Sequence, residues 1–571
     1  MASLKDIVAL AEKHGLLEPE DSENPQDGHK VAKKSQATSL VELAGDLALW
    51  HTPDMEAFAS VSLENRQVNW LLASKEFKRW LNSRYFQEQG KVPGAQAAQD
   101  ALSVLEGQSL FEGPEHRVSV RLAGHDGKIY LDLTNENWEA VEITKQGWRL
   151  VAEPPVKFRR SKGMLAIPAP ASGGNLRLLR QFVNVSDGDW PLVLAWLVAA
   201  LRDTGPYPVM VLNGEHGSAK STTERVLRRL IDPNKADLRC EPRDPRDLMI
   251  AAANGLVVAL DNLSHIPTWL SDALCRLATG GGFSTRTLYE NDQETIFVAQ
   301  RPVILNGINE IVTRGDLLDR SLTITCPVIP ETNRRTEEEF WREFDAVRPF
   351  ILGALLDAVS HGLAHINDTV LNFMPRMADF AVWTVATEPA LGIMPDTFMA
   401  AYTGNRKIAN ELVLDTAPVV APLRELLEIA TWEGPATELL VELDGRVTER
   451  IRGLKSWPKN GRGLSISLRR LAPNLRVVGI EVDFRQSPGS RSKRIIRISK
   501  SPGFTDASDA NDASDAIDSK IEEDLAPQAL SIATHPSDSS DARHAQATQG
   551  DASVANIPIR SRIPEQWREP L

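Results

Sequence analysis

The chain has little cysteine, few aromatic residues and no long hydrophobic run. Its three cysteines, Cys240, Cys275 and Cys326, are too few and too widely spaced for a disulfide framework or a zinc site. The longest uncharged apolar run, residues 190–201, has 12 residues, whereas a membrane-spanning helix needs about 20. The first residues, MASLKDIVALAEKHG, lack the apolar core of a secretory signal. These absences predict a cytoplasmic protein that does not cross a membrane.

The composition that remains is that of a multidomain globular protein. Of the 571 residues, 42% are hydrophobic and 25% are charged, which is enough for three or four domains of about 150 residues. The formal charge of -13 is unevenly distributed: residues 446–500 hold 15 Lys and Arg against 3 Asp and Glu, whereas residues 501–571 hold 5 against 13. A compact basic segment inside an acidic chain indicates that a polyanion binds there.

Composition and periodicity divide the chain into six segments and predict an α/β fold. A polar tail rich in Asp and Ala cannot bury enough apolar surface to offset its chain entropy, so the C-terminal segment is predicted to be disordered. The expected segments are an N-terminal helix and linker at 1–34, a mixed α/β domain of unassigned role at 35–155, a parallel-sheet α/β domain at 175–330, a helical lid at 331–433, a basic module at 435–500 and the acidic tail at 501–571.

The strongest chemical signal is the sequence VMVLNGEHGSAKST at residues 209–222, in which an apolar strand enters a glycine-containing loop and a helix leaves it. Glycines there let backbone N–H groups approach phosphates, Lys220 would meet the β- and γ-phosphates of ATP, and the Ser221 hydroxyl would ligate Mg²⁺. Ala219 stands where a P-loop normally has glycine. The expected nucleotide-binding residues are Gly214, Glu215, His216, Gly217, Ser218, Ala219, Lys220, Ser221 and Thr222.

A second strand signal follows about 40 residues later, in the apolar run LVVAL that ends at Asp261. A carboxylate at the carboxyl end of a buried parallel strand is in position to hold Mg²⁺ through water. The next residue is Asn262, where an ATPase usually has Glu. An amide can orient the attacking water but cannot take its proton, so the sequence predicts slow hydrolysis or another base.

Two further polar residues follow predicted strands. Asn306 ends the run PVIL and would touch the attacking water and the γ-phosphate, although Asn-Gly is also good turn chemistry. Arg320 precedes the next strand, where it would either reach the nucleotide of a neighbouring subunit or form a salt bridge with Asp316 or Asp319. Arg376 in the helical lid segment is either a sensor residue of the ATPase or a solvated arginine at the start of a helix.

These motifs, in this order and within about 110 residues, resemble the core of superfamily 3 helicases, in particular the AAA+ ATPases of phages and plasmids related to poxvirus primase-helicases and virulence-associated E proteins. The resemblance covers residues 175–330 and implies a P-loop AAA+ core, ATP and Mg²⁺ as cofactors, and a hexamer-type ring that moves on DNA. It also implies a hairpin that points basic residues into the ring channel. Here Arg286 and Tyr289 are in the matching place; a structural hairpin with a solvated Arg is the alternative.

The basic segment supplies a second set of candidate DNA contacts. Residues 464–471 have helical apolar spacing, and two strand-like runs joined by a Ser-Pro-Gly-Ser turn follow them. Helix, strand, turn and strand is the order of a winged helix, and a solvated basic face is the alternative. The candidate contacts are Arg469 and Arg470 on the helix and Arg491, Lys493 and Arg494 on the wing.

Together the sequence favours an ATP-dependent, DNA-acting AAA+ ATPase, a replicative helicase or initiator of a phage or mobile element. Lys220, Asp261, Asn262, Asn306 and Arg320 would be the catalytic residues, with Ser221 and Asp261 holding the metal. The N-terminal domain could bind replication partners. The alternative is a DNA-associated switch that binds ATP with little turnover, which Asn262 favours.

Overall fold

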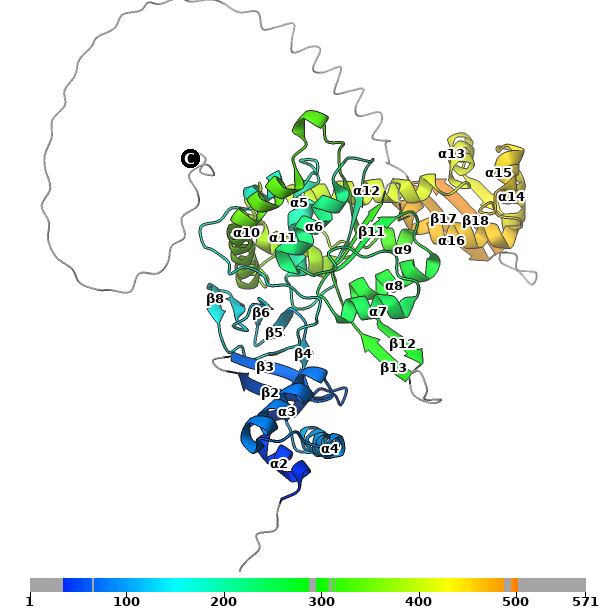
Figure 1. Ribbon diagram of the computed structural model, residues 1–571. Helices are drawn as coiled ribbons and strands as arrows, with labels where there is room; N and C mark the ends of the chain where they lie inside the picture. The colour runs from blue at the N-terminus through cyan, green and yellow to red at the C-terminus, as the bar shows by residue number, and fades with distance from the viewer. Residues whose placement is uncertain are drawn as a thin grey trace, which may run out of the picture. The chain divides into compact units, whose positions relative to one another are not determined.

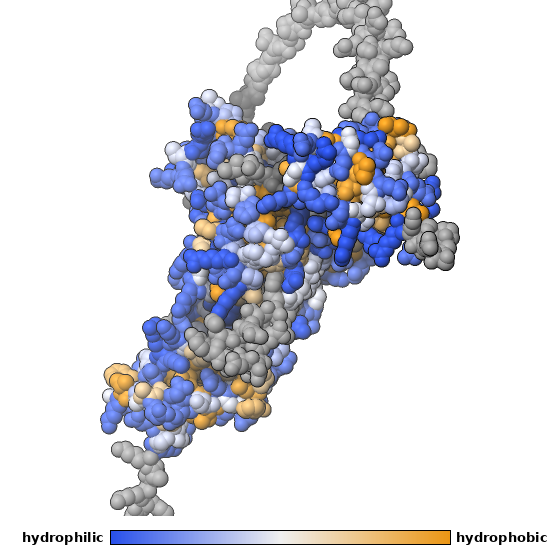
Figure 2. Space-filling view, turned by 90° about the vertical axis from the view of Figure 1, so that its right-hand side faces the viewer, coloured by the Kyte–Doolittle hydropathy of each residue, from blue (hydrophilic) through white to orange (hydrophobic). Residues whose placement is uncertain are grey.

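The computed structural model describes residues 34–63, 66–286, 294–307, 311–312, 314–486 and 494–501. It contains two compact units that divide between Val118 and Ser119 (Figure 1). The predicted N-terminal helix and, apart from Ser501, the predicted disordered tail lie outside the described residues. The face shown in Figure 2 is mainly hydrophilic, and its hydrophobic side chains are scattered in small groups.

The first unit packs three helices against an antiparallel sheet in the order β1-β2-β3. Its core is aromatic: the buried Trp50 ring stacks on Phe58 with centroids 4.5 Å apart, and Phe77 and Tyr85 are buried beside the sheet. These rings form a core rather than a platform for bases. The elements are α2 (Gln36–Leu43), β1 (Ala48–His51), β2 (Ala57–Leu63), β3 (Arg66–Leu71), α3 (Lys75–Gln89) and α4 (Ala95–Phe111).

The second unit is built on a parallel four-stranded sheet in the order β11-β14-β10-β15. Alternate residues of the strand at 209–213 face two separate hydrophobic cores. Met210 and Leu212 pack into one core, and Val209 and Val211 pack into the other. Because both faces are covered, β10, β11 and β14 begin with three or more apolar residues, and their polar residues come at the carboxyl ends. They are β10 (Val209–Asn213), β11 (Val258–Leu263), β14 (Val303–Gly307) and β15 (Ser321–Thr325).

Helices cover both faces of this sheet. Figure 1 shows α5 (Trp190–Ala200), α6 (Lys220–Ile231) and α10 (Glu337–His365) on one side and α7 (Pro245–Ala253) with α8 (Thr268–Thr279) on the other. Helix α10 is long and apolar enough to cross a bilayer, but 72% of its most apolar stretch is buried inside the protein, which is the pattern of a core helix. The remaining helices of this region are α9 (Gly315–Leu318), α11 (Ala378–Thr387) and α12 (Thr397–Asp415).

An antiparallel sheet, β5-β6-β7-β8, also belongs to the second unit. Leu131 and Val141 of this sheet share a hydrophobic core with α5 and α10. The domain predicted at 35–155 is therefore divided at Val118, because the apolar face of this sheet is buried against the helices of the second unit. Strands β5 and β6 form a hairpin, in which His125 pairs with Lys128 next to the turn. The strands are β5 (Leu122–His125), β6 (Lys128–Asp132), β7 (Ala140–Thr144) and β8 (Gly147–Val151).

Within its described residues, the C-terminal module has four helices and an antiparallel sheet in the order β16-β18-β17. Because β16 (Trp432–Gly434) pairs with β18 (Arg494–Lys500), the module begins before the predicted boundary at 435. Leu464, Leu468 and Leu475 form the buried face of α16 (Gly461–Val477). The other elements are α13 (Val420–Ile429), α14 (Ala436–Asp444), α15 (Glu449–Gly453) and β17 (Ile480–Gln486).

Short elements complete the described chain. They are β4 (Val118–Ser119), β9 (Lys157–Phe158), β12 (Gly282–Arg286), β13 (Glu294–Val298) and the 3₁₀ helices η1 (Leu176–Gln181), η2 (Glu331–Asn333) and η3 (Glu388–Ala390).

Candidate nucleotide site

The loop from β10 to α6 turns through several residues of positive φ. A side chain at Gly214 would place its Cβ 2.5 Å from the Cys326 carbonyl oxygen, so this position requires glycine. Gly217 has a φ of +79° and Ala219 a φ of +56°, both in the left-handed region. Ala219 thus occupies, with a Cβ, a conformation that glycine adopts freely. The alanine at this position, where the sequence pattern normally has glycine, therefore strains the backbone.

Lys220 is the first residue of α6, and its ammonium lies inside the loop. Its Nζ donates to the carbonyl oxygens of Gly214 and Glu215 at 2.7 and 2.8 Å. His216, in the same loop, is exposed. The positive charge is therefore held at the N-terminus of a 12-residue helix, where the helix dipole also favours an anion.

Three predicted residues meet beside this lysine. Ser221 Oγ donates to Asp261 Oδ1 at 2.7 Å, and Asn306 Nδ2 donates to the same carboxylate oxygen at 2.6 Å. The register of the parallel sheet explains the meeting, since β11, β14 and β10 are adjacent and end at the same edge. A hydroxyl and a carboxylate side by side are hard oxygen ligands, the kind that Mg²⁺ prefers with water completing its shell. The donor set at Ser221 and Asp261 thus fits this ion.

Glu224 is a member of this cluster that the sequence analysis missed. It lies one turn after Lys220 on α6, is fully buried and accepts a short hydrogen bond from Asn306 Nδ2. Burial, and next the nearby Asp261, raise its pKa well above the ordinary value of a glutamate. The signal was available in the helical spacing, because Glu224 shares the inward face of α6 with Leu227 and Ile231. A carboxyl on an apolar face is unusual and needs a partner.

Asn262 is part of the cluster through its backbone rather than its side chain. Its N–H donates to Asn306 Oδ1 at 2.8 Å, its φ is +56°, and its side chain is exposed. Asparagine tolerates the left-handed region better than most residues. The amide of Asn262 therefore faces solvent at the mouth of the site, where it can contact water.

Arg320 lies just before β15 and donates to the backbone carbonyl of Asp316 at 2.6 Å. The carboxylates that were considered as its partners pair instead with Arg376, which forms a short ion pair with Asp319 and lies 4.0 Å from Asp316. The alternative for Arg320, a salt bridge with Asp316 or Asp319, is thus not formed among the described residues, and the role of Arg320 in a neighbouring subunit stays a prediction.

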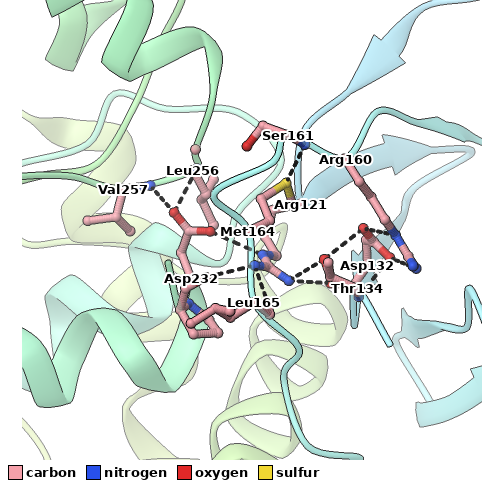
Figure 3. Close-up of polar contacts among 12 residues, drawn as sticks. Arg121, Asp132, Thr134, Arg160, Ser161, Met164, Leu165, Asp232, Leu256 and Val257 are labelled. Carbon is pink, nitrogen blue, oxygen red and sulfur yellow. Dashed lines mark hydrogen bonds and ion pairs between the residues drawn. The ribbon is translucent and has the colours of Figure 1, made fainter. Parts of the chain in front are cut away.

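An ion pair behind the site fixes the strand that carries Asp261. Asp232, at the end of α6, accepts hydrogen bonds from the N–H groups of Leu256 and Val257, both at 2.9 Å, just before β11 begins (Figure 3). Its other oxygen accepts from Arg121 Nε at 3.1 Å, and both side chains are fully buried. Arg121 also donates to the carbonyl oxygens of Asp132 and Leu165. The network joins the β5–β8 sheet to the start of β11.

The predicted DNA contacts lie in two places. The hairpin exists as β12 and β13, with Arg286 opposite Glu294 in register, while Tyr289 and the side chain of Arg286 lie outside the described structure. In the C-terminal module, Arg469 lies over the Phe484 ring at 4.7 Å, and Arg470 and Arg494 are exposed. Arg491 and Lys493 lie outside the described residues.

Comparison with known proteins identifies two segments. Residues 176–405 match the family model of the actinomycete integrative conjugative element replication protein, and residues 419–513 match that of the AICE RepA C-terminal domain. No curated protein matches the chain.

Among solved structures, the apo C-terminal region of NrS-1 aligns with 82% of this chain and all of its own. Three such structures have 14–15% identity and TM-scores of 0.35 to 0.36. Similarity at this level does not establish a shared fold. The two family models together cover more than half of the sequence, so the chain belongs to the replication proteins of actinomycete integrative conjugative elements.

Proposed function

We propose that this replication protein is an ATP-dependent AAA+ ATPase that acts on DNA, as a helicase or an initiator of the mobile element. The expectation of a replication protein from a mobile element is confirmed by the family; the superfamily 3 assignment and the ring stay predictions. The observation that carries the proposal is the meeting of Ser221, Asp261 and Asn306 beside the P-loop lysine.

Each side chain has a role that follows from its place. Lys220 would balance the charge of the β- and γ-phosphates, and Ser221 with Asp261 would hold Mg²⁺, which neutralises charge that develops on the phosphates. Asn306 fixes the orientation of the Asp261 carboxylate through the 2.6 Å hydrogen bond. The sheet order β11-β14-β10-β15 supports this assignment, because it places the strand of Asn306 between the strands of Asp261 and the P-loop. In a ring, Arg320 would reach the nucleotide of the next subunit.

A second function, an ATP-dependent switch with little turnover, is favoured by the residues around the attacking water. The exposed Asn262 amide can orient water but cannot accept its proton. Glu224, the nearest buried carboxyl, is fully enclosed and held by Asn306, so it does not reach solvent. ATP binding would then change the oligomeric state or DNA affinity without rapid hydrolysis.

Phosphate release with and without single-stranded DNA distinguishes the two functions. The ATPase function predicts DNA-stimulated hydrolysis that falls to background in Lys220→Ala and persists in the matched surface variant Lys145→Ala. Calorimetry on the same proteins should show ATP affinity lower by about a hundredfold in Lys220→Ala, since a charge that meets phosphate is removed. Tight ATP binding with negligible hydrolysis would support the switch. Equal ATP binding by Lys220→Ala would contradict both.

A further inference from the structure

A basic pocket lies in the second unit, apart from the P-loop. Its volume is about 490 Å³, and its walls come from the loop before Met164, the turn after α6 and the end of α7. The charged and amide side chains that line it are Arg159, Arg160, Lys162, Arg239, Asn234 and Asn254. None of its eight described lining residues carries a carboxylate or an aromatic ring. The pocket therefore presents mostly hydrogen-bond donors and positive charge.

The charge of the pocket is only partly neutralised. Arg160 is paired with Asp132, at 2.6 and 3.0 Å, so its charge is balanced (Figure 3). Arg239 differs: within the described part of the chain its guanidinium has no hydrogen bond or ion pair, and its backbone alone is bonded, to Ala259 and Asp261 of β11.

A buried amide on the pocket wall has an unused donor. Asn234 is 2% exposed, and its Oδ1 accepts from the Ala236 N–H at 3.0 Å, which fixes the orientation of the amide. Its Nδ2 has no hydrogen-bond partner among the described residues. A buried N–H without an acceptor costs about 1–3 kcal/mol, and this nitrogen is itself enclosed in the wall, so only a small shift of the Asn234 amide would bring it to a ligand in the pocket.

The wall around Asn234 is preformed. The Lys235 N–H donates to the Gly163 carbonyl at 2.8 Å, and the Leu165 N–H donates to the Pro233 carbonyl at 3.0 Å, which joins the two segments that face the pocket. A Cβ at Gly163 would lie 2.8 Å from Asn234 Oδ1, so the close approach depends on glycine. A ligand would therefore find its donors already in position.

We propose that this pocket binds the phosphodiester backbone of single-stranded DNA. Phosphate oxygens are acceptors of single negative charge and match a wall of guanidinium, ammonium and amide donors. The missing aromatic ring argues against a site that stacks a base. The volume is that of a pocket for a small molecule, which admits a short stretch of one strand and not the width of a duplex.

This site is separate from the β12–β13 hairpin and the C-terminal module, and it goes beyond the proposed ATPase function. The pocket is nevertheless connected to the candidate nucleotide site, because the Arg239 carbonyl accepts a hydrogen bond from the Asp261 N–H at 2.8 Å. A strand held by Arg239 would lie near Asp261, the residue proposed to hold Mg²⁺.

The test uses the full chain without nucleotide and a fluorescein-labelled oligothymidylate of about 20 nucleotides. Anisotropy titrations at several salt concentrations compare the wild type, Lys162→Gln with Arg239→Gln, and a control that removes two exposed charges elsewhere in the unit, Lys145→Gln with Lys407→Gln. The pocket variant should bind about tenfold more weakly, and its slope of log K against log salt should fall by about 1.4, since each lost phosphate contact removes about 0.7. The control should stay within about twofold of wild type.

Two further variants keep the result interpretable. Lys162→Gln alone changes an exposed side chain and should give about a third of the effect on a logarithmic scale, and Arg239→Lys, which keeps the charge, should bind nearly as wild type does. The proposal would be overturned if the double variant Lys162→Gln with Arg239→Gln and the single variant Lys162→Gln both kept the wild-type affinity and salt slope. So would loss of inorganic tripolyphosphate binding with oligothymidylate binding intact, because the pocket would then hold a free anion. Neither readout depends on ATP hydrolysis, so failure of the ATPase proposal would be distinguishable.

Discussion

Asn306 donates from one amide nitrogen to two carboxyl groups, Asp261 Oδ1 at 2.6 Å and Glu224 at a shorter distance. Its amide oxygen accepts from the backbone N–H of Asn262 at 2.8 Å. One buried side chain thus connects α6, β11 and β14. The two carboxyl groups would repel each other if both were ionised, and burial and next the nearby Asp261 raise the pKa of Glu224, so this amide is what holds the two groups together at the end of the sheet.

Asn306→Ala should destabilise the second unit by about 3 kcal/mol, because it leaves the buried Glu224 carboxyl and the Asn262 N–H without their Asn306 partner, whereas Asp261 keeps its hydrogen bond from Ser221. Urea unfolding followed by circular dichroism measures the loss. Glu224→Gln combined with Asn306→Ala should cost at least about 1 kcal/mol less than the sum of the single changes, since the repulsion is gone. Strict additivity would show that the two side chains do not interact.

Ala219→Gly should stabilise the protein. An L-residue in the left-handed region costs about 1–2 kcal/mol, whereas glycine adds about 0.4–1 kcal/mol of unfolded-state entropy, so the net gain is about 0.5–1 kcal/mol. Thermal unfolding without nucleotide is the measurement. Gly107→Ala, at a helical position with open space around its Cβ, is a control for the opposite exchange and should also stabilise. A lower melting temperature for Ala219→Gly would mean that the strain is not present in solution.

The strand, loop and helix at residues 209–222 and the polar residues at the carboxyl ends of β11 and β14 could be predicted because local sequence determines them. Gly214 and Lys220 are recognised from the residue types in the loop that follows one apolar run, and Asp261 from its place at the end of another. The division at Val118 could not be predicted, because it depends on which core buries Leu131 and Val141, and periodicity gives only the existence of an apolar face. To predict the role of Glu224, the residues of α6 have to be placed on the faces of the helix, which shows that Glu224 lies on the buried face. The basic pocket brings Lys162 and Arg239 together from distant segments, which no local pattern reveals.

The sheet β5–β8 should lose stability in acid through Glu142. Hydrogen bonds from Arg149 and Lys128 lower the pKa of this carboxyl to about 2, below the ordinary value of about 4.3. Between these values the unfolded chain binds more protons than the folded one, so stability is present above pH 4.3 and is lost as the pH falls toward 2. Glu142→Gln should be less stable at pH 6 and should lose less between pH 5 and 3. Parallel pH profiles of the two proteins would contradict this.

Arg320 offers a test of the ring. If it reaches the nucleotide of a neighbouring subunit, Arg320→Ala and Lys220→Ala are each inactive, but mixed rings contain sites with an intact Lys220 and an intact Arg320. A mixture should then recover part of the DNA-stimulated ATPase, up to about a quarter of wild type if subunits mix at random. Co-assembly is checked by pull-down of differently tagged variants. Co-assembled mixtures with no recovered activity would show that Arg320 only holds the Asp316 carbonyl.

The C-terminal module should bind duplex DNA chiefly through the exposed face of α16. Arg470 is exposed there, whereas Arg469 also covers the Phe484 ring, so Arg470→Gln tests the contact without loss of packing. It should weaken duplex binding several-fold and reduce the salt slope by about 0.9, the value for one phosphate contact on B-DNA. Arg469→Gln should weaken binding as well and also lower the unfolding temperature. Lys455→Gln, an exposed change in the same module, is the matched control and should leave the slope unchanged. If Arg470→Gln behaves as the control does, α16 does not enter the groove, and the charge of residues 446–500 is a solvated surface.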